Sequence, residues 1–348
     1  MTATPSPFGP SGRRRTAQAA ARLAAAGALL AGCASDGSQS ALNPKSPDAA
    51  LIAQLWWWFL GVSAVVLAVV VLVLAVGLLR GRGAQGARPL PESRRWALVV
   101  SGGIVAPAVA ILGIVVSGLW IGRETGARPT PPDVTVEVAG KLWWWEVRYR
   151  DAQGGLIATT ANEIHLPVGR MVRLLLLSDN VIHSFWVPNL DGKTDMIPGQ
   201  VNELWFAPGE AGTYRGQCAE LCGVQHALMG FLVVATEPAE FEAWLAHQAR
   251  PAAEPEGALA RRGREVFQQS CARCHTVRGT AARGGQGPDL THLAGRRTLA
   301  AATIPNTRGH LGGWIADPQS IKPGNLMPGF ALDPPDLHAL LAYLEQLE

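Results

Sequence analysis

Two long apolar runs dominate the first third of the chain. Residues 51–79 and 96–122 contain no charged side chain. Each run is longer than the roughly 20 residues that a helix needs to cross a bilayer, so the pattern predicts a transmembrane hairpin over residues 51–123. Tryptophans near the ends of the runs, at positions 56–58, 96 and 120, are typical of the membrane–water interface.

The pattern changes to short runs of β-forming residues over residues 132–237. Glycine and proline separate these runs, and no helical period competes with them. Such punctuation predicts an all-β sandwich or a small barrel. The strongest runs are Val134–Val138, Trp143–Tyr149, Val172–Leu177, Glu203–Phe206 and Phe231–Ala235.

The last third of the chain returns to helical spacing. Residues 238–255 connect the two parts and include a predicted helix over 239–248. Residues 256–348 predict a compact all-α domain, with a first helix over 257–269 and a closing helix over 337–347. The expected architecture is a two-helix transmembrane hairpin, an all-β sandwich and an all-α domain.

The N-terminus has the features of a bacterial export signal. Three arginines at 13–15 precede the short apolar stretch 23–31. The tetrapeptide Leu-Ala-Gly-Cys that ends at Cys33 resembles the lipoprotein box. This resemblance implies that residues 1–32 are a signal peptide, that Cys33 is lipidated and that 33–50 form a short external segment. A chance cysteine after an alanine-rich signal is the alternative.

The distribution of basic residues predicts the orientation of the hairpin. The linker 80–95 holds five arginines and one glutamate. The positive-inside rule places this linker in the cytoplasm and everything after residue 123 on the outer side of the bacterial inner membrane. The lipidated Cys33 would lie on the same outer side, so the two signals agree.

Composition narrows the class of protein. The 348 residues suffice for two or three domains, and 16% of them are charged, against roughly 25% in ordinary soluble domains. This argues against a disordered or nucleic-acid-binding chain. Residues 132–240 carry 7 basic and 13 acidic side chains, whereas residues 256–348 carry 10 and 8. We therefore hypothesise that the all-α domain docks on the β domain through opposite charge.

Two clusters in the β region carry metal-ligand chemistry. Two thiolates, two imidazoles and one thioether form a soft ligand set that suits copper. A structural zinc site would have no need of the methionine. Cys218 and Cys222 are four residues apart, so one loop can present both sulfurs and hold two copper ions between them. The expected ligands are His183, Cys218, Cys222, His226 and Met229, with the backbone carbonyl of Glu220.

The pattern Cys-x-Glu-x-Cys-Gly-x-x-His-x-x-Met over residues 218–229 resembles the dinuclear copper A site of cytochrome c oxidase subunit II. The resemblance implies a cupredoxin fold for residues 132–237. It also implies that the Glu220 side chain binds magnesium at the interface with subunit I. Trp143 would take up electrons where cytochrome c docks, and burial in the core is the alternative. Val100 stands where that family has a glutamate, so no proton route through this subunit is implied.

A second motif, Cys271-Ala-Arg-Cys274-His275, is the attachment signature of c-type haem. Its two thiols would add to the two vinyl groups, and His275 would bind the iron from one side. Met327, the only methionine after residue 229, would bind from the other side. A thioredoxin-like redox pair would need a βαβ context and has no use for His275. The rival axial ligands are His292, His310 and His338.

Together the motifs resemble the copper subunit of a caa-type haem-copper oxidase with a fused cytochrome c domain. The resemblance implies that electrons pass from a soluble cytochrome c through haem c and copper A to haem a of subunit I, where O2 is reduced. Subunit III and membrane lipid would be further partners. A nitric oxide reductase subunit is one alternative. A membrane copper-delivery protein is another, and it would need neither His226, Met229 nor haem.

Overall fold

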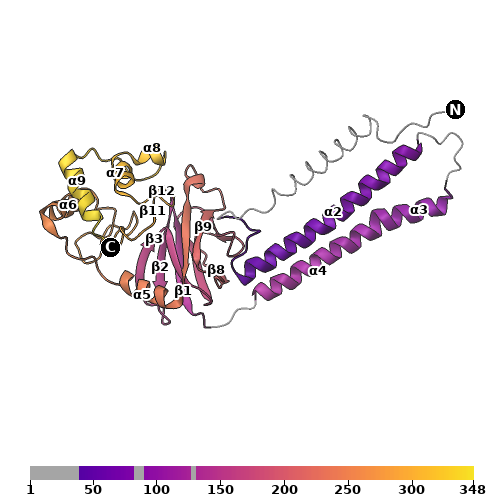
Figure 1. Ribbon diagram of the computed structural model, residues 1–348, viewed down its shortest axis with the longest axis horizontal. Helices are drawn as coiled ribbons and strands as arrows, with labels where there is room; N and C mark the ends of the chain where they lie inside the picture. The colour runs from indigo at the N-terminus through magenta and orange to yellow at the C-terminus, as the bar shows by residue number, and fades with distance from the viewer. Residues whose placement is uncertain (1–38, 82–89, 127–130) are drawn as a thin grey trace, which may run out of the picture.

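The computed structural model describes residues 39–81, 90–126 and 131–348. A β-sandwich lies between a long helical hairpin on one side and a small helical domain on the other (Figure 1). The predicted signal peptide, Cys33 and most of the arginine-rich linker lie outside the described residues.

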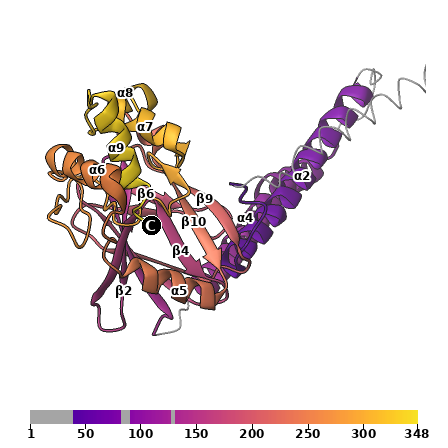
Figure 2. The same ribbon diagram turned by 60° about the vertical axis from the view of Figure 1, so that its left-hand side comes forward.

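The hairpin consists of two long helices that lie side by side (Figures 1 and 2). Both are long and apolar enough to cross a membrane, and no residue in the most apolar part of either is buried in the single chain. Both also extend by a few residues beyond the predicted apolar runs, since residues outside each run are helical as well. The bounds are Pro47–Gly81 for α2, Glu92–Val100 for α3, Ser101–Val105 for the π-helical turn η1 and Ala106–Gly126 for α4.

The π-helical turn ends two residues before Pro107, the second residue of α4. In a regular α-helix the proline ring would crowd the carbonyl of Gly103, and a widened turn is one way to relieve that contact. Further along α4, a Cβ on Gly113 would lie 3.5 Å from the ring of Trp58 in α2. The two helices therefore pack closely at this glycine.

Two five-stranded sheets form the sandwich. The first has the order β3-β2-β1-β5-β8 and the second the order β4-β10-β9-β6-β7. The pairs β1–β5 and β4–β10 are parallel, and the other pairs are antiparallel. The strands are β1 (Val134–Lys141), β2 (Trp144–Arg150), β3 (Leu156–Ala161), β4 (Glu163–Pro167), β5 (Val172–Ser178), β6 (His183–Trp186), β7 (Thr194–Met196), β8 (Asn202–Phe206), β9 (Gly212–Cys218) and β10 (Gly230–Thr236).

Aromatic side chains from both sheets fill the sandwich core. Trp145 of β2 packs edge-on against Phe185 and Phe231, which belong to the second sheet. A Cβ on Gly216 would lie 2.2 Å from the Phe231 ring, so only glycine fits there. Because side chains alternate along a strand, Trp144 points the other way and packs against Ala301 of the C-terminal domain.

The C-terminal domain is built mainly from helices. The predicted first helix is confirmed as α6 (Gly257–Ser270), and it packs on α9 (Pro334–Leu344). A Cβ on Gly263 would lie 1.9 Å from the carbonyl oxygen of Ala339, so this glycine lets the two helices meet. The predicted closing helix starts earlier than expected, because Pro334 occupies its first turn, where a proline costs no hydrogen bond.

Shorter elements complete the chain. The predicted helix over 239–248 is confirmed as α5 (Pro238–Gln248), which lies along the sandwich and stacks Trp244 on His165 with ring centroids 4.0 Å apart. The remaining elements are α7 (Arg308–Ala316), α8 (Pro318–Ile321), β11 (Thr298–Leu299) and β12 (Ile304–Pro305).

Candidate copper and haem sites

The sulfur and nitrogen atoms of the expected copper ligands converge in one buried spot. Cys218 Sγ lies 3.7 Å from Cys222 Sγ and 3.8 Å from His183 Nδ1. Cys222 Sγ lies 3.7 Å from both His226 Nδ1 and Met229 Sδ. The structure therefore brings together all five side chains that the sequence singles out.

Strand pairing explains how distant parts of the chain meet here. Phe185 of β6 pairs with Cys218 at the end of β9, which sets His183 beside the cysteine. The loop after Cys218 then passes through a 3-10 turn, η2 (His226–Leu228), before β10 begins. Against the other side of His183, a Cβ on Gly140 would lie 2.7 Å from the imidazole ring, so β1 approaches the site very closely.

Electrostatics at the cysteines favour metal binding. The pKa of the Cys218 thiol is lowered to about 3, because the hydrogen bond with Cys222 stabilises its thiolate. The same contact raises the pKa of Cys222. The Glu220 carbonyl oxygen also lies 3.2 Å from Cys218 Sγ. Since a metal takes thiolates, a buried thiolate beside a second thiol, two imidazoles and a thioether fits soft copper ions.

Trp143 contacts both the copper-ligand loop, residues 218–229, and the cavity in the C-terminal domain. Its indole nitrogen donates a hydrogen bond to the carbonyl of Cys222 at 2.9 Å. The ring is partly buried and packs on Gly223, whose φ of +116° suits only glycine. The side chain faces the C-terminal domain, because it lines that domain's cavity. It is thus neither an open surface residue nor part of the closed core.

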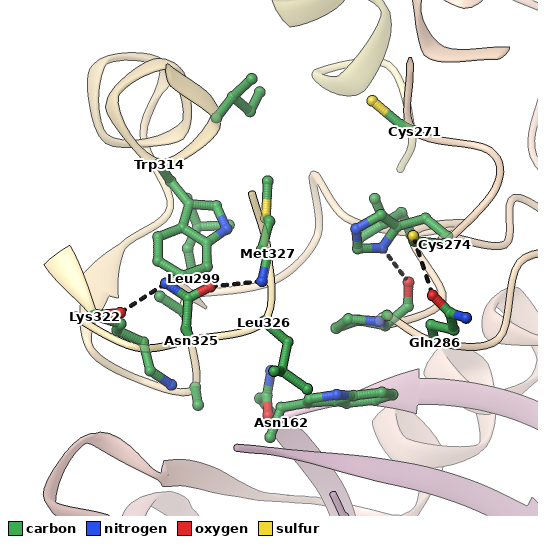
Figure 3. A pocket seen from close by; sticks show the side chains of 18 of the residues that line it. Asn162, Cys271, Cys274, Gln286, Leu299, Trp314, Lys322, Asn325, Leu326 and Met327 are labelled. Carbon is green, nitrogen blue, oxygen red and sulfur yellow. Dashed lines mark hydrogen bonds between the residues drawn. The ribbon is translucent and has the colours of Figure 1, made fainter. Parts of the chain in front are cut away.

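The haem motif lines one wall of a cavity of about 450 Å³ (Figure 3). His275 donates from Nδ1 to the carbonyl of Pro288 at 2.8 Å, which orients the ring and leaves Nε2 as the free ligand atom. Burial lowers the pKa of His275, so it stays neutral as a metal ligand must. A Cβ on Gly287 would lie 2.6 Å from this ring. Burial also raises the pKa of Cys271 to about 11.

Met327 faces the same cavity, and the three rival histidines do not line it. Asn325 and Gln319 hold the backbone of Met327 with hydrogen bonds of 2.8 and 3.1 Å. Both ring nitrogens of His292 lie within hydrogen-bond distance of main-chain oxygens, those of Glu348 and Arg250, so neither faces the cavity. The cavity, its four predicted residues and its apolar lining fit a haem. The cavity is also lined by Arg296, whose buried Nε has no hydrogen-bond partner among the described residues. A haem carboxylate would supply that partner.

The β-sandwich, residues 132–237 and called the copper domain below, supplies another wall of the haem cavity. The sequence did not predict this wall. Trp143 and Asn162 belong to this wall, together with Lys141, Leu142, Trp144, Asp179 and Asn180. Nothing in the local sequence of these residues indicates it, because the wall forms only where two domains meet.

Hydrogen bonds from side chains to backbone groups hold the two domains together. The buried Glu163 accepts from the backbone amides of Arg297 and Thr298 at 2.6 and 3.0 Å. Arg215 donates to the carbonyl of Ala302 at 2.7 Å. Within the described residues, no ion pair joins 131–248 to 256–348. The contact therefore depends less on opposite charge than the net charges suggest.

Comparison with known proteins identifies the family. Residues 152–236 match the family described as cytochrome c oxidase subunit II, periplasmic domain, and residues 260–348 match cytochrome c. A protein named cytochrome c oxidase subunit 2 from Alkalihalophilus pseudofirmus is 35% identical over 328 residues, which cover 92% of this chain and 94% of the relative. A protein of the same name from Bacillus subtilis is 34% identical over 226 residues, or 62% of each chain.

The solved periplasmic domain of subunit II of cytochrome oxidase from Bradyrhizobium japonicum is 32% identical and covers 34% of this chain and 94% of that one, with a TM-score of 0.32. On the family and relative matches, the chain belongs to the cytochrome c oxidase subunit 2 family. The predicted fold class is confirmed as well: two apolar helices, a cupredoxin-like sandwich and a cytochrome c domain. The two family matches indicate copper in the sandwich and haem in the C-terminal domain.

Proposed function

We propose that this chain takes up electrons for a cytochrome c oxidase. In this proposal electrons from a soluble cytochrome c pass through a covalent haem c and a dinuclear copper A centre to haem a of subunit I, for O2 reduction. The shared wall between the two candidate sites is the observation that carries it: Trp143 lines the haem cavity and donates a hydrogen bond to Cys222 O. A single residue, Trp143, thus contacts both candidate sites.

Each predicted residue has a task in this function. Cys218, Cys222, His183, His226, Met229 and the Glu220 carbonyl would hold the two copper ions. Cys271 and Cys274 would form the thioethers to haem, and His275 and Met327 would bind its iron. Bound copper and haem would supply one-electron oxidation and reduction. The chain orients His275 through Pro288 and excludes water from the buried cysteines.

Of the two points of electron uptake that the sequence leaves open, the haem and Trp143, we favour the haem. Because Trp143 lies against the C-terminal domain, a soluble donor would reach the haem first. Trp143 then serves as the connection between the two centres within one chain.

The wider assembly follows from the same proposal. The hairpin would sit in the bacterial inner membrane, with both redox domains outside and Cys33 lipidated. Subunits I and III would be neighbours, and the Glu220 side chain would bind magnesium against subunit I. A nitric oxide reductase would use the same chain with another acceptor. A copper-delivery protein is disfavoured, since it has no use for His226 and Met229 beside Cys222.

The test is the metal content and low-temperature EPR spectrum of the full-length protein, produced with haem maturation. We expect two coppers and one covalent haem per chain, with a mixed-valence copper signal that Cys218→Ser abolishes while the haem remains. One copper or none, with intact haem, would reject the copper A assignment. The subunit that copurifies would distinguish an oxidase from a nitric oxide reductase.

A further inference from the structure

A buried lysine crosses the contact between the two domains. Lys322 directly follows α8, and only 3% of it is exposed. Its Nζ donates a hydrogen bond to the backbone carbonyl of Trp143 at 3.1 Å. The lysine thus reaches from the segment that carries Met327 to the residue that touches the copper-ligand loop.

No carboxylate among the described side chains forms an ion pair with this lysine, and its Nζ donates one hydrogen bond, to Trp143 O. The charged group that interacts with it is the Cys222 thiolate, which belongs to the proposed copper site. A buried ammonium without a counter-charge is costly, so such groups are paired when the protein is complete. Burial also lowers the pKa of Lys322 to about 8.

The cavity indicates which anion would pair with Lys322. The lysine lines the haem cavity, on the side away from Cys271 and Cys274 (Figure 3). In a haem, the vinyl groups that react with cysteines and the two propionate groups lie on opposite edges of the ring. Thioethers at the two cysteines would therefore turn the carboxylates toward the end of the cavity where Lys322 lies.

We propose that Lys322 binds a haem propionate and ties it to the backbone of Trp143. This inference rests on the proposed covalent haem. It makes Lys322 a positioning residue, which holds the propionate edge of the haem at the wall that the copper domain supplies. It also assigns the haem a part in closing the contact between the domains.

The control comes from a second lysine on the same cavity. Lys141 also lines it, but its Nζ already lies 2.5 Å from Asp179 and 3.7 Å from Glu146. Lys141→Met therefore removes a cavity lysine that has its own carboxylates, whereas Lys322→Met removes one that has none.

The experiment uses the full-length protein as wild type, Lys322→Met, Lys322→Arg and Lys141→Met. Covalent haem is counted by the pyridine haemochrome spectrum, the propionate bending band is recorded by resonance Raman, and the haem midpoint potential is titrated. We expect Lys322→Met to keep its haem and shift the Raman band. Its reduced-to-oxidised ratio should fall about tenfold at fixed potential, or about 59 mV, because loss of a nearby cation favours the oxidised form. Lys141→Met should leave the band in place.

The outcomes separate the two proposals. Absence of covalent haem from the wild type would overturn the proposed function itself. Haem at the wild-type level with an unchanged band and potential in Lys322→Met would overturn the role of Lys322 alone. If Lys322→Met does not fold, Lys322→Arg decides: a shifted propionate band supports the contact, and an unchanged band rejects it.

Discussion

The copper-ligand loop and the haem cavity are held in place in different ways. At the copper site the protein itself supplies the packing, since Cys218, Cys222 and His183 are at most 4% exposed and their ligand atoms lie within 4.8 Å of one another. At the haem site His275 and Met327 face a cavity of about 450 Å³. A cavity of this size leaves its walls without packing partners.

This difference indicates how much the stability of each domain depends on its cofactor. The strands that carry His183 and Cys218 are already paired, so the sandwich should fold without copper. The helices around the haem cavity lack part of their core until the cofactor fills it. A ligand that binds only the folded state stabilises that state in proportion to its affinity. The predictions below test this contrast.

The largest expected effect is the loss of the proposed covalent haem. The double variant Cys271→Ala/Cys274→Ala should lose the cooperative thermal unfolding of the C-terminal domain while the sandwich unfolds as in the wild type. Calorimetry and copper content of the full-length protein measure the two domains separately. Simultaneous loss of copper would show that the sandwich depends on the haem, contrary to the contrast drawn above.

Glu163 should have the next largest effect, because its carboxylate holds two backbone amides across the domain contact. Glu163→Ala leaves both amides of Arg297 and Thr298 without this acceptor, at a cost of about 3 kcal/mol to docking. Hydrogen exchange at these two amides should accelerate about 100-fold. Glu163→Gln keeps an acceptor oxygen and is the matched control. Equal exchange in Glu163→Ala and the wild type would mean that the contact does not depend on this residue.

A smaller effect is expected at the crossing of α6 and α9. Gly263→Ala places a Cβ where the carbonyl of Ala339 lies 1.9 Å away, and overpacking of this kind costs about 1–3 kcal/mol. Chemical denaturation should show the loss in the C-terminal domain only. Gly309→Ala in α7 is the control, since no described atom beyond its two chain neighbours and the backbone of its own helix lies within 4 Å of the new methyl group. A destabilised sandwich in Gly263→Ala would contradict separate unfolding.

The smallest effect should come from salt. No ion pair among the described residues crosses between the domains, and Glu163 and Arg215 bind backbone groups instead. The rate of electron transfer from haem to copper, measured after flash reduction, should therefore change less than about twofold between low and high ionic strength. A steep fall with salt would restore the hypothesis that opposite net charge holds the domains together.

Much of the fold could be predicted because each domain has its own periodicity. Four of the five predicted β runs lie wholly in strands, and the fifth does so except for Trp143, which is in the turn before β2. Strands β3, β4, β6, β7 and β9 were not predicted. β6 has only four residues, His-Ser-Phe-Trp, and owes its conformation to pairing with β7 and β9. Sequence alone cannot show such a strand, since its hydrogen-bond partners are distant in the chain.

The candidate ligands could also be predicted, since chemistry and spacing were enough. Cys218 and Cys222 share one loop, and Cys271, Cys274 and His275 share one turn, so local geometry already brings them together. His183 and Met327 lie far from these motifs in the chain: His183 followed from the chemistry of the soft ligand set, and Met327 is the only methionine after residue 229.

By itself, the sequence determined the membrane hairpin, the class of each domain and the identity of the candidate ligands, because these depend on local period and spacing. Only the tertiary structure decided that Trp143 lies between the two candidate centres, that the copper domain closes the haem cavity, and that the buried Lys322 has no carboxylate partner among the described residues. These features arise where surfaces of two domains meet. No periodicity along a single chain encodes such a meeting, since it depends on three-dimensional complementarity between residues far apart in sequence.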